Sequence, residues 1–339
     1  MRIARHDLNT DVLIVAEIGN NHEGDVTLAT DLVHRAADAG ADAVKFQTIV
    51  PERLVARTEA ARLDQLRRFA LTRADFERLA DVAAARDVLF LSTPFDPDCV
   101  DWLDALVPAF KIASGDNDYD PLLDRVADTG KPVMMSTGFV DLDGAARAAA
   151  RVRDRWHARS VDQHLALLHC VAAYPTPPED ANLRAIGALG TLGVTVGYSD
   201  HTLGTDAAVI AVAAGARIVE KHFTIAHDHS PFRDHALSAD PAQMRELVRR
   251  IRAAERLLGT GRKQPTPTET ASESAVRRTA VAMRPLAAGH VVEPKDLDWV
   301  RAARGVRCSE IDRIVGRPLV RSLDAGDPVH ADLWREEGV

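Results

Sequence analysis

The chain has 339 residues, of which 46% are hydrophobic, and it carries a formal net charge of −8. This apolar content allows a large core and more than one domain. An acidic balance with Arg interleaved among Asp and Glu argues against a nucleic-acid-binding protein, which gathers positive charge on one face. No apolar run approaches the roughly 20 residues that span a bilayer, and residues 1–10 lack the apolar segment of a secretory signal. We therefore expect a soluble, cytoplasmic protein.

Short apolar runs that end in polar residues recur along the first two thirds of the chain. They cover residues 12–20, 43–48, 88–96, 109–116, 132–138, 165–175, 194–200 and 217–224. Between most of them lie stretches with helical spacing, such as 28–40 and 74–87. Strands that alternate with helices indicate parallel pairing. About eight such units predict an α/β fold, a closed (β/α)8 TIM barrel, better than an open doubly wound sheet.

The polar residues fall at the carboxyl ends of these predicted strands, where the active site of such a barrel lies. Taken one at a time, they could be helix caps, turn residues or hydrogen-bonded core groups. Their recurrence at matching strand positions instead predicts one shared mouth. Its members are Glu17, Lys45, Gln47, Thr93, Lys111, Ser114, Ser136, Tyr174, Ser199, His201, Glu220 and His222.

The positions of the few lysines are a second indication of a ligand site. Of 42 Lys and Arg residues, six are Lys, so the chain uses Arg almost wherever a generic cation suffices. Lys45, Lys111 and Lys221 nevertheless lie inside apolar, strand-like runs, where a solvated charge is not expected. Since an ammonium differs from a guanidinium in reach and hydration, we expect these three lysines to serve a ligand.

The predicted mouth suggests a metal beside an anion pocket. His201 and His222 follow consecutive strands and could hold one divalent ion with open positions for substrate and water. Asp234 lies in the loop after the eighth strand, over the mouth. Lys45 and Lys111, with the nearby serines, would hold a phosphorylated, carboxylated anion. Such a site fits carbon–carbon bond formation between phosphoenolpyruvate and an aldehyde, with a carboxylate that activates water.

The C-terminal part of the chain has a different pattern of apolar, Gly and Pro residues. A last helix ends near Gly259, and the polar stretch that follows lacks a sustained apolar period, which is typical of a linker. Beyond it, short apolar pieces broken by Gly and Pro indicate a small, mainly β module. We therefore expect a catalytic barrel over residues 1–260, a linker over 261–275 and the module over 276–339.

A family resemblance rests on motifs spread along nearly the whole chain. They are "AEIGNNHEGD" (16–25), "AGADAVKFQT" (39–48), "STPFD" (92–96), "KIASGD" (111–116), "KPVMMSTG" (131–138), "LLHC" (167–170), "YPTP" (174–177), "GYSDHTLG" (197–204), "EKHFT" (220–224) and "DHALSADP" (234–241). In this order they resemble the N-acetylneuraminate (sialic acid) synthase family. The C-terminal module resembles that family's SAF or antifreeze-like domain, a β-clip.

The resemblance implies a metal-dependent condensation of phosphoenolpyruvate with an open-chain amino sugar such as N-acetylmannosamine, which yields a nine-carbon 2-keto acid and phosphate. It also implies a domain-swapped homodimer, in which each antifreeze-like domain covers the partner's barrel mouth. The metal would be manganese, with magnesium or cobalt as alternatives. By motif, His201 and His222 would hold the metal, and Glu17 would serve the acid/base step. Phosphoenolpyruvate would contact Lys45, Lys111, Ser114, Ser136 and Ser199, and the acceptor would lie near Gln47, Asp116, Tyr174 and Asp234.

Three positions depart from the family's pattern. Ala172 stands where relatives often have Asn or Ser, Asp116 stands where Glu is common, and Ala302 stands where an Arg follows the Trp-Val pair. These departures leave the acceptor open, so a legionaminate, pseudaminate or other keto-sugar acid synthase is the alternative. An interpretation of another class, a non-catalytic sugar-binding or structural protein, leaves the lysines at the mouth unexplained.

Overall fold

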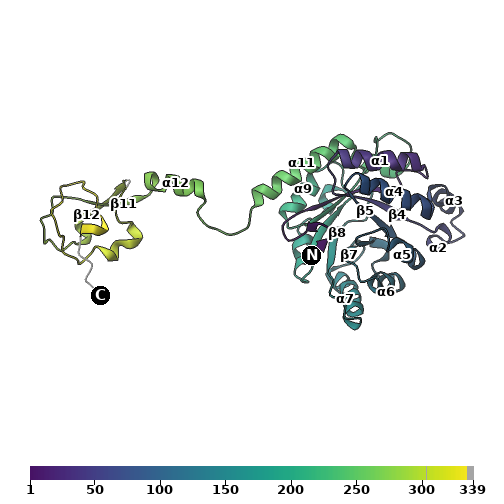
Figure 1. Cartoon of the computed structure of the whole chain (residues 1–339), viewed down its shortest axis with the longest axis horizontal. Helices are drawn as coiled ribbons and strands as arrows, with labels where there is room; N and C mark the ends of the chain where they lie inside the picture. The colour runs from purple at the N-terminus through teal and green to yellow at the C-terminus, as the bar shows by residue number, and fades with distance from the viewer. Residues whose placement is uncertain (303, 334–339) are drawn as a thin grey trace. The chain divides into compact units, whose positions relative to one another are not determined.

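The computed structural model describes residues 1–302 and 304–333. The chain divides into two compact units, Met1–Gly259 and Thr260–Val339, each with its own core (Figure 1). Among the described residues, we find no helix whose length and apolar content would let it cross a membrane.

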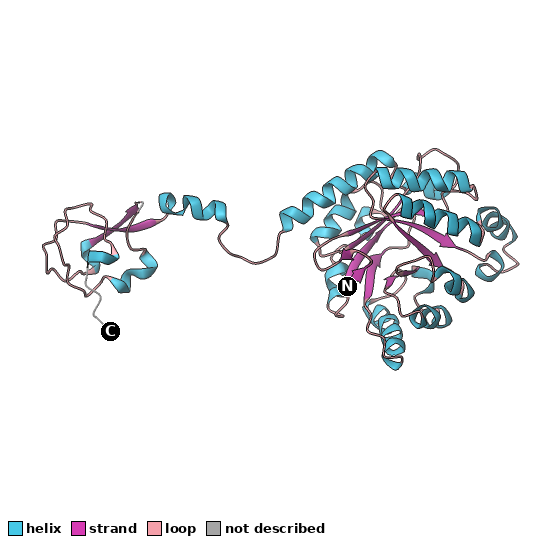
Figure 2. Ribbon diagram, in the orientation of Figure 1, coloured by secondary structure: helices cyan, strands magenta, loops and turns pink. Residues whose placement is uncertain are grey.

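The first unit is a barrel of eight parallel strands. They are β3 (Leu13–Gly19), β4 (Ala43–Thr48), β5 (Leu89–Pro94), β6 (Phe110–Ile112), β7 (Val133–Ser136), β8 (Leu165–Cys170), β9 (Thr195–Asp200) and β10 (Ile218–His222). Their order is β5-β4-β3-β10-β9-β8-β7-β6, and the end strands β5 and β6 pack against each other. Helices surround the strands (Figure 2). The predicted barrel and its eight strands are confirmed.

Several of the barrel helices begin at a side-chain cap. The helices are α1 (Val26–Asp38), α2 (Pro51–Leu54), α3 (Ala60–Phe69), α4 (Arg73–Ala85), α5 (Pro97–Leu103), α6 (Asp120–Asp128), α7 (Leu142–Ala158), α8 (Ala185–Gly190), α9 (Asp206–Ala213), α10 (Arg233–Leu237) and α11 (Pro241–Leu258). Asp25 caps α1, and Thr72 and Asp240 form capping boxes at α4 and α11. Side-chain caps satisfy backbone N–H groups that the first helical turn leaves free.

Alternation along the strands separates the side chains inside the barrel from those that pack against the helices. On β10, Ile218 packs inside the barrel and Val219 packs outward against the helices. The amino-terminal half of the interior is apolar, and Met1 and Ile3, from a small hairpin of β1 (Arg2–Ile3) and β2 (His6–Asp7), pack into it. The carboxyl-terminal half carries the polar side chains. The fold therefore confines the chemistry to one end.

The second unit contains a two-stranded antiparallel sheet of β11 (Arg278–Ala282) and β12 (Leu297–Arg301), extended by isolated bridges and short 3-10 turns. Asp296 is fully buried and accepts hydrogen bonds from Arg284 at 2.7 Å and His290 at 2.6 Å. These contacts satisfy the buried Asp296 carboxylate, and the core of the unit is an apolar cluster.

Part of the segment expected to be a linker is helical. Residues Pro267–Val276 form helix α12, which belongs to the second unit. Thr266 and Glu269 form a capping box at its start, and Glu273 pairs with Arg277 at 2.7 Å and with Arg307 at 2.9 Å. Caps and ion pairs stabilise a helix that has little apolar periodicity of its own.

Candidate active site

A cavity of about 250 Å³ opens at the carboxyl ends of the barrel strands. Its lining includes a set of side chains that face the barrel axis from all eight strands or the loops that follow them. Those predicted from the sequence are Glu17, Lys45, Gln47, Thr93, Lys111, Ser114, Ser136, Tyr174, Ser199, His201, Glu220, His222 and Asp234. The structure therefore brings together residues separated by more than 200 positions in the chain.

Lys45 lies at the centre of a buried polar network. Its Nζ is 2.7 Å from Glu17 Oε2 and donates to Thr93 Oγ1 at 2.8 Å. Gln47 Nε2 donates to Glu17 Oε1 at 3.0 Å, and Asn20 Nδ2 donates to Gln47 Oε1 at 2.9 Å. Burial raises the pKa of Glu17 to about 6, although Lys45 opposes the rise. A carboxylate with such a pKa suits a general base near neutral pH.

Lys111 is the less well paired of the two lysines. It is 3% exposed, donates to the Ile112 carbonyl at 3.1 Å, and lies 3.8 Å from Glu220 Oε2. Burial lowers the pKa of Lys111, and Lys45 lowers it further, against the opposing pull of Glu220. A buried ammonium without a tight counter-ion is costly, so this site favours an incoming anion.

His201 and His222 lie side by side, with ring centroids 5.4 Å apart. His201 Nδ1 lies 2.8 Å from the Val171 carbonyl, to which it donates, so its Nε2 keeps a lone pair. His222 Nδ1 is buried and has no hydrogen-bond partner among the described residues. Burial lowers the pKa of each imidazole to about 4, so both are neutral near pH 7. Two neutral imidazoles with free lone pairs are suited to a divalent metal ion.

Comparison with known proteins assigns the barrel to a protein family and the C-terminal module to a domain type. A model of the NeuB family matches residues 32–263, and a model of the SAF domain matches residues 277–333. The chain belongs to the NeuB family. The resemblance seen in the sequence motifs is confirmed.

Relatives of this NeuB-family chain match over most of its length. An uncharacterized protein of Methanocaldococcus jannaschii is 40% identical over 94% of this chain and 93% of its own. The N,N'-diacetyllegionaminic acid synthase of Legionella pneumophila is 38% identical over 95% and 93%. The crystal structure of an N-acetylneuraminic acid synthetase from Leptospira borgpetersenii has a TM-score of 0.73 at 32% identity, covering 78% of this chain and 91% of the other.

Two sequence expectations differ from the structure of this NeuB-family chain. Lys221 lies outside the cavity, where its Nζ is 3.1 Å from Asp200 Oδ2 and donates to the Thr202 carbonyl. The expectation that it serves a ligand is therefore wrong, because it faces the helices rather than the barrel axis. Asp116 lies in the 3-10 turn Ser114–Asp116 and does not line the cavity. Burial raises the pKa of Asp116 to about 6.

Several lining residues of the NeuB-family chain were not predicted as site residues. They are Asn20, Arg62, Phe95, Ala113, Gly115, Phe139, Cys170, Ala172, Phe232 and Arg233. Asn20 and Cys170 directly adjoin predicted strand ends, so strand position could have identified them. Arg233 adjoins the predicted Asp234 in the loop after β10, so loop position could have identified it as well. Arg62 lies on α3, after β4, where no strand pattern points to the mouth.

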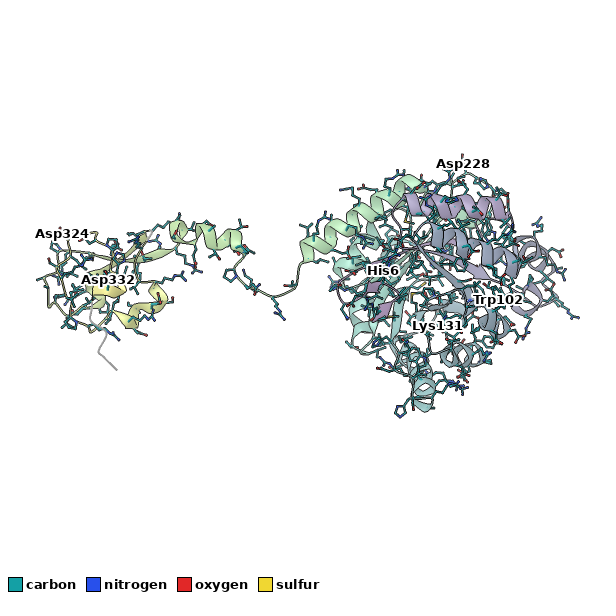
Figure 3. All side chains as sticks on the ribbon, in the orientation of Figure 1. His6, Trp102, Lys131, Asp228, Asp324 and Asp332 are labelled. Carbon is teal, nitrogen blue, oxygen red and sulfur yellow. The ribbon has the colours of Figure 1, made fainter. Side chains whose placement is uncertain are left out.

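Polar residues that follow Glu17, among them Asn21 and Glu23, form hydrogen bonds with the loop after β10. Asn21 Nδ2 donates to the Phe223 carbonyl at 2.8 Å and to Ser238 Oγ at 2.9 Å. Buried His235 lies 2.6 Å from Thr224 Oγ1 and 3.1 Å from Glu23 Oε1. These contacts fix the segment that carries Arg233 and Asp234. The same loop extends to Asp228, which lies at the outer edge of the barrel unit (Figure 3).

Proposed function

We propose that this protein condenses phosphoenolpyruvate with an open-chain aldose to give a nonulosonic, sialic-acid-type 2-keto acid and phosphate. The observation that carries the proposal is the pair of buried lysines, Lys45 and Lys111, at the floor of a cavity lined by three serines. Phosphate and carboxylate groups recruit such ammonium and hydroxyl donors. A non-catalytic binding protein would have no use for Glu17, whose raised pKa prepares it for proton transfer.

The histidine pair fits a divalent metal ion, which we propose to be Mn2+, with Mg2+ or Co2+ as alternatives. Among the described residues, no group of three or more His, Cys, Asp or Glu side chains is placed to hold a metal. The ion would have His201 and His222, whose rings lie side by side, as its imidazole ligands and keep positions for substrate and water. When bound, it would polarise the acceptor's aldehyde.

The remaining side chains divide the work of the reaction. Lys111 and Lys45 would hold phosphoenolpyruvate with C3 towards the aldehyde. The C2–C3 π electrons of this enol phosphate would form the C3–C1 bond, while the aldehyde C=O π pair moves to its oxygen, which takes up a proton. Glu17 would take a proton from the water that adds to C2, which has become electron-poor. Phosphate would then leave from C2 and the 2-keto group would form. Phosphoenolpyruvate, aldose and water thus give keto acid and phosphate.

The acceptor is an amino sugar such as N-acetylmannosamine, or the precursor of a legionaminic-type acid. The second alternative follows from the 38% identity to the Legionella pneumophila enzyme. One residue of this chain also bears on the choice of acceptor. Ala172 lines the cavity and has no side-chain hydrogen-bonding group. At this position the cavity therefore differs from the pattern of sialic acid synthases.

Phosphate release tests this function directly. Purified protein would be incubated with phosphoenolpyruvate, Mn2+ and, separately, N-acetylmannosamine and 2,4-diacetamido-2,4,6-trideoxymannose. We expect phosphate release that depends on one of the sugars, with equal formation of a 2-keto acid. Phosphate release that is independent of sugar, or none with either sugar, would contradict the proposal.

We further propose a symmetric homodimer in which the C-terminal unit of one chain covers the mouth of its partner. Loops at the carboxyl end of the barrel expose large apolar side chains, including Phe139 at 80% and Leu203 at 65% exposure. Exposed apolar groups around a functional cavity are typical of a covered surface. A cover would also keep bulk water from the electron-poor carbon, so that the water that adds to C2 is the one beside Glu17.

Complementation between variants tests the shared site. A chain ending at Gly259 would keep the barrel core but lack the cover, and Lys111→Met would disable the barrel of a full-length chain. Each alone should condense sugar poorly. Their mixture, under conditions of subunit exchange, should regain activity, because the intact barrel receives the intact cover of its partner. An inactive mixture that contains demonstrated heterodimers would show that each cover acts within its own chain.

A further inference from the structure

The turns that follow β6 and β7 meet beside two of the serines proposed to hold phosphoenolpyruvate. Ser114 opens the 3-10 turn Ser114–Asp116, and Asn117 directly follows this turn. Ser136 ends β7, and Gly138 comes shortly after it. Ser114 and Ser136 line the cavity, but Asn117 and Gly138 are not part of its lining. The two turns thus combine side chains that can meet a ligand with residues that can only support them.

Asn117 ties the two turns together. It is 3% exposed, and its Nδ2 donates to the Ser136 carbonyl at 3.3 Å and to the Gly138 carbonyl at 3.0 Å. A side-chain amide nitrogen carries two protons, so one Asn can satisfy both carbonyls. Because Asn117 adjoins the turn that carries Ser114, these two hydrogen bonds fix the serine of one turn relative to the serine of the other.

Gly138 lets the backbone of the second turn approach the Ser114 hydroxyl. Its N–H donates to Ser114 Oγ at 3.0 Å. A Cβ atom at Gly138 would lie 2.7 Å from Ser114 Oγ and 2.9 Å from Ser114 Cβ. Carbon atoms that are not bonded prefer a separation of about 3.5–4.0 Å. Any side chain at position 138 would therefore displace Ser114.

The contact with Gly138 leaves the proton of the Ser114 hydroxyl free for a ligand. A hydroxyl that accepts from an N–H group still has its own O–H to donate. The Cys170 thiol lies within reach of Ser114, but sulfur is a weak acceptor, so an anion would take its place. Ser136 Oγ is buried and has no hydrogen-bond partner among the described residues. Both hydroxyl groups are thus available to an anion.

We propose that Asn117 and Gly138 are positioning residues of the anion site. They hold Ser114 and Ser136 so that both hydroxyl groups donate to phosphoenolpyruvate, and they do not contact the ligand themselves. The inference rests on the proposed function and extends it to two residues outside the cavity. Donors that folding has already ordered bind a ligand more tightly than donors that must be ordered on binding. The buried lysines supply charge to the same anion, and the two turns supply direction.

Calorimetric titration of the full-length chain with phosphoenolpyruvate, without metal or sugar, tests this role. Asn117→Leu keeps a branched side chain and removes both donors, and Gly138→Ala displaces the Ser114 hydroxyl. We expect each change to raise the Kd of phosphoenolpyruvate by roughly 10-fold, the scale of one hydrogen bond to a charged group. In steady-state assays the KM for phosphoenolpyruvate should rise by a similar factor, while kcat changes little.

A double-mutant cycle separates positioning from a general loss of stability. Asn117→Leu should raise Kd by a smaller factor in a chain that already carries Ser114→Ala, because residues that act through one network are not additive. The same factor in both backgrounds would show that Asn117 does not act through Ser114 and would overturn its positioning role. If Asn117→Leu fails to fold, Gly138→Ala carries the same cycle, since it removes no hydrogen-bond donor of Asn117.

Asn21→Leu is the matched control. Asn21 is also a buried amide that joins two segments, and it donates to the Phe223 carbonyl and to Ser238 Oγ. Its replacement should lower the denaturation midpoint and leave the Kd of phosphoenolpyruvate unchanged. An unchanged Kd in both Asn117→Leu and Gly138→Ala, with wild-type affinity intact, would remove the two turns from anion binding.

The fate of the proposed reaction is distinguished by the wild-type protein. If it binds phosphoenolpyruvate, and the variants weaken binding as expected, but no sugar is condensed, the positioning role stands and the proposed reaction is removed. Wild-type protein that binds neither phosphoenolpyruvate nor inorganic phosphate would remove both.

Discussion

Replacing His201 or His222 by Ala should reduce turnover by roughly 10³-fold or more. Each change removes one of the two imidazoles proposed to hold the metal. The loss of the metal's effect would raise the activation free energy by several kcal/mol, since 1.36 kcal/mol corresponds to about tenfold in rate. Both side chains lie at the mouth rather than in the apolar core. The circular dichroism and the denaturation midpoint should therefore stay close to those of the wild type. Mn2+ binding, measured by calorimetry without substrate, should weaken in parallel with turnover.

His157→Ala is the matched control for this experiment. It removes an exposed imidazole from α7, so Mn2+ affinity and turnover should not change. Full activity of His201→Ala or His222→Ala in chelator-treated buffer without added metal would remove the histidine pair from the reaction.

Replacing Lys111 by Met should weaken phosphoenolpyruvate binding by about 2–5 kcal/mol, the cost of truncating one partner of a buried charge pair. Lys111 is buried and lacks a tight carboxylate partner, so its ammonium is available to the ligand's anion. The change keeps the length of the aliphatic stem and removes the charge. Calorimetric titration with phosphoenolpyruvate measures the loss.

Lys221→Met provides a control at an equally buried lysine of the barrel. Lys221 pairs with Asp200 outside the cavity, so its loss should lower stability and leave phosphoenolpyruvate affinity unchanged. Removing one partner of a buried pair lowers the free energy of unfolding by about 3–5 kcal/mol. If the single variant fails to fold, the double variant Lys221→Met with Asp200→Asn removes the buried Asp200 carboxylate that would otherwise lack a counter-ion. Equal loss of affinity in this control and in Lys111→Met would show that buried charge, rather than ligand contact, explains the result.

Much of the barrel and its mouth was predictable because period-two alternation and strand ends are local properties of the sequence. Period-two alternation could also have predicted the direction of the Lys221 side chain. Lys221 lies between Glu220 and His222, and neighbours on a strand face opposite sides, so it had to point away from the mouth that those two residues line. The scarcity of lysine singles Lys221 out, but composition carries no information on which face of a strand a side chain occupies.

Other features depend on contacts that no local pattern encodes. Arg62 reaches the mouth because Phe69 on its helix packs against Phe232, more than 150 positions away. The hairpin that carries Ile3 is too short to show a periodic signal, yet it fills the apolar half of the barrel. Asp116 belongs to a three-residue turn, and the direction of a turn side chain follows from backbone dihedrals rather than from spacing.

The imperfectly paired ammonium of Lys111 has a consequence for the life of the protein in a cell. Its desolvation is paid in folding free energy whenever the anion pocket is vacant. A ligand that binds only the native state returns stability, about 2.7 kcal/mol when its concentration is a hundred times Kd. Proteases act on chains that have opened, and the population of opened chains falls as that stability returns. Scarcity of the proposed anion would thus shorten the half-life of the protein, so that its abundance follows the supply of that anion.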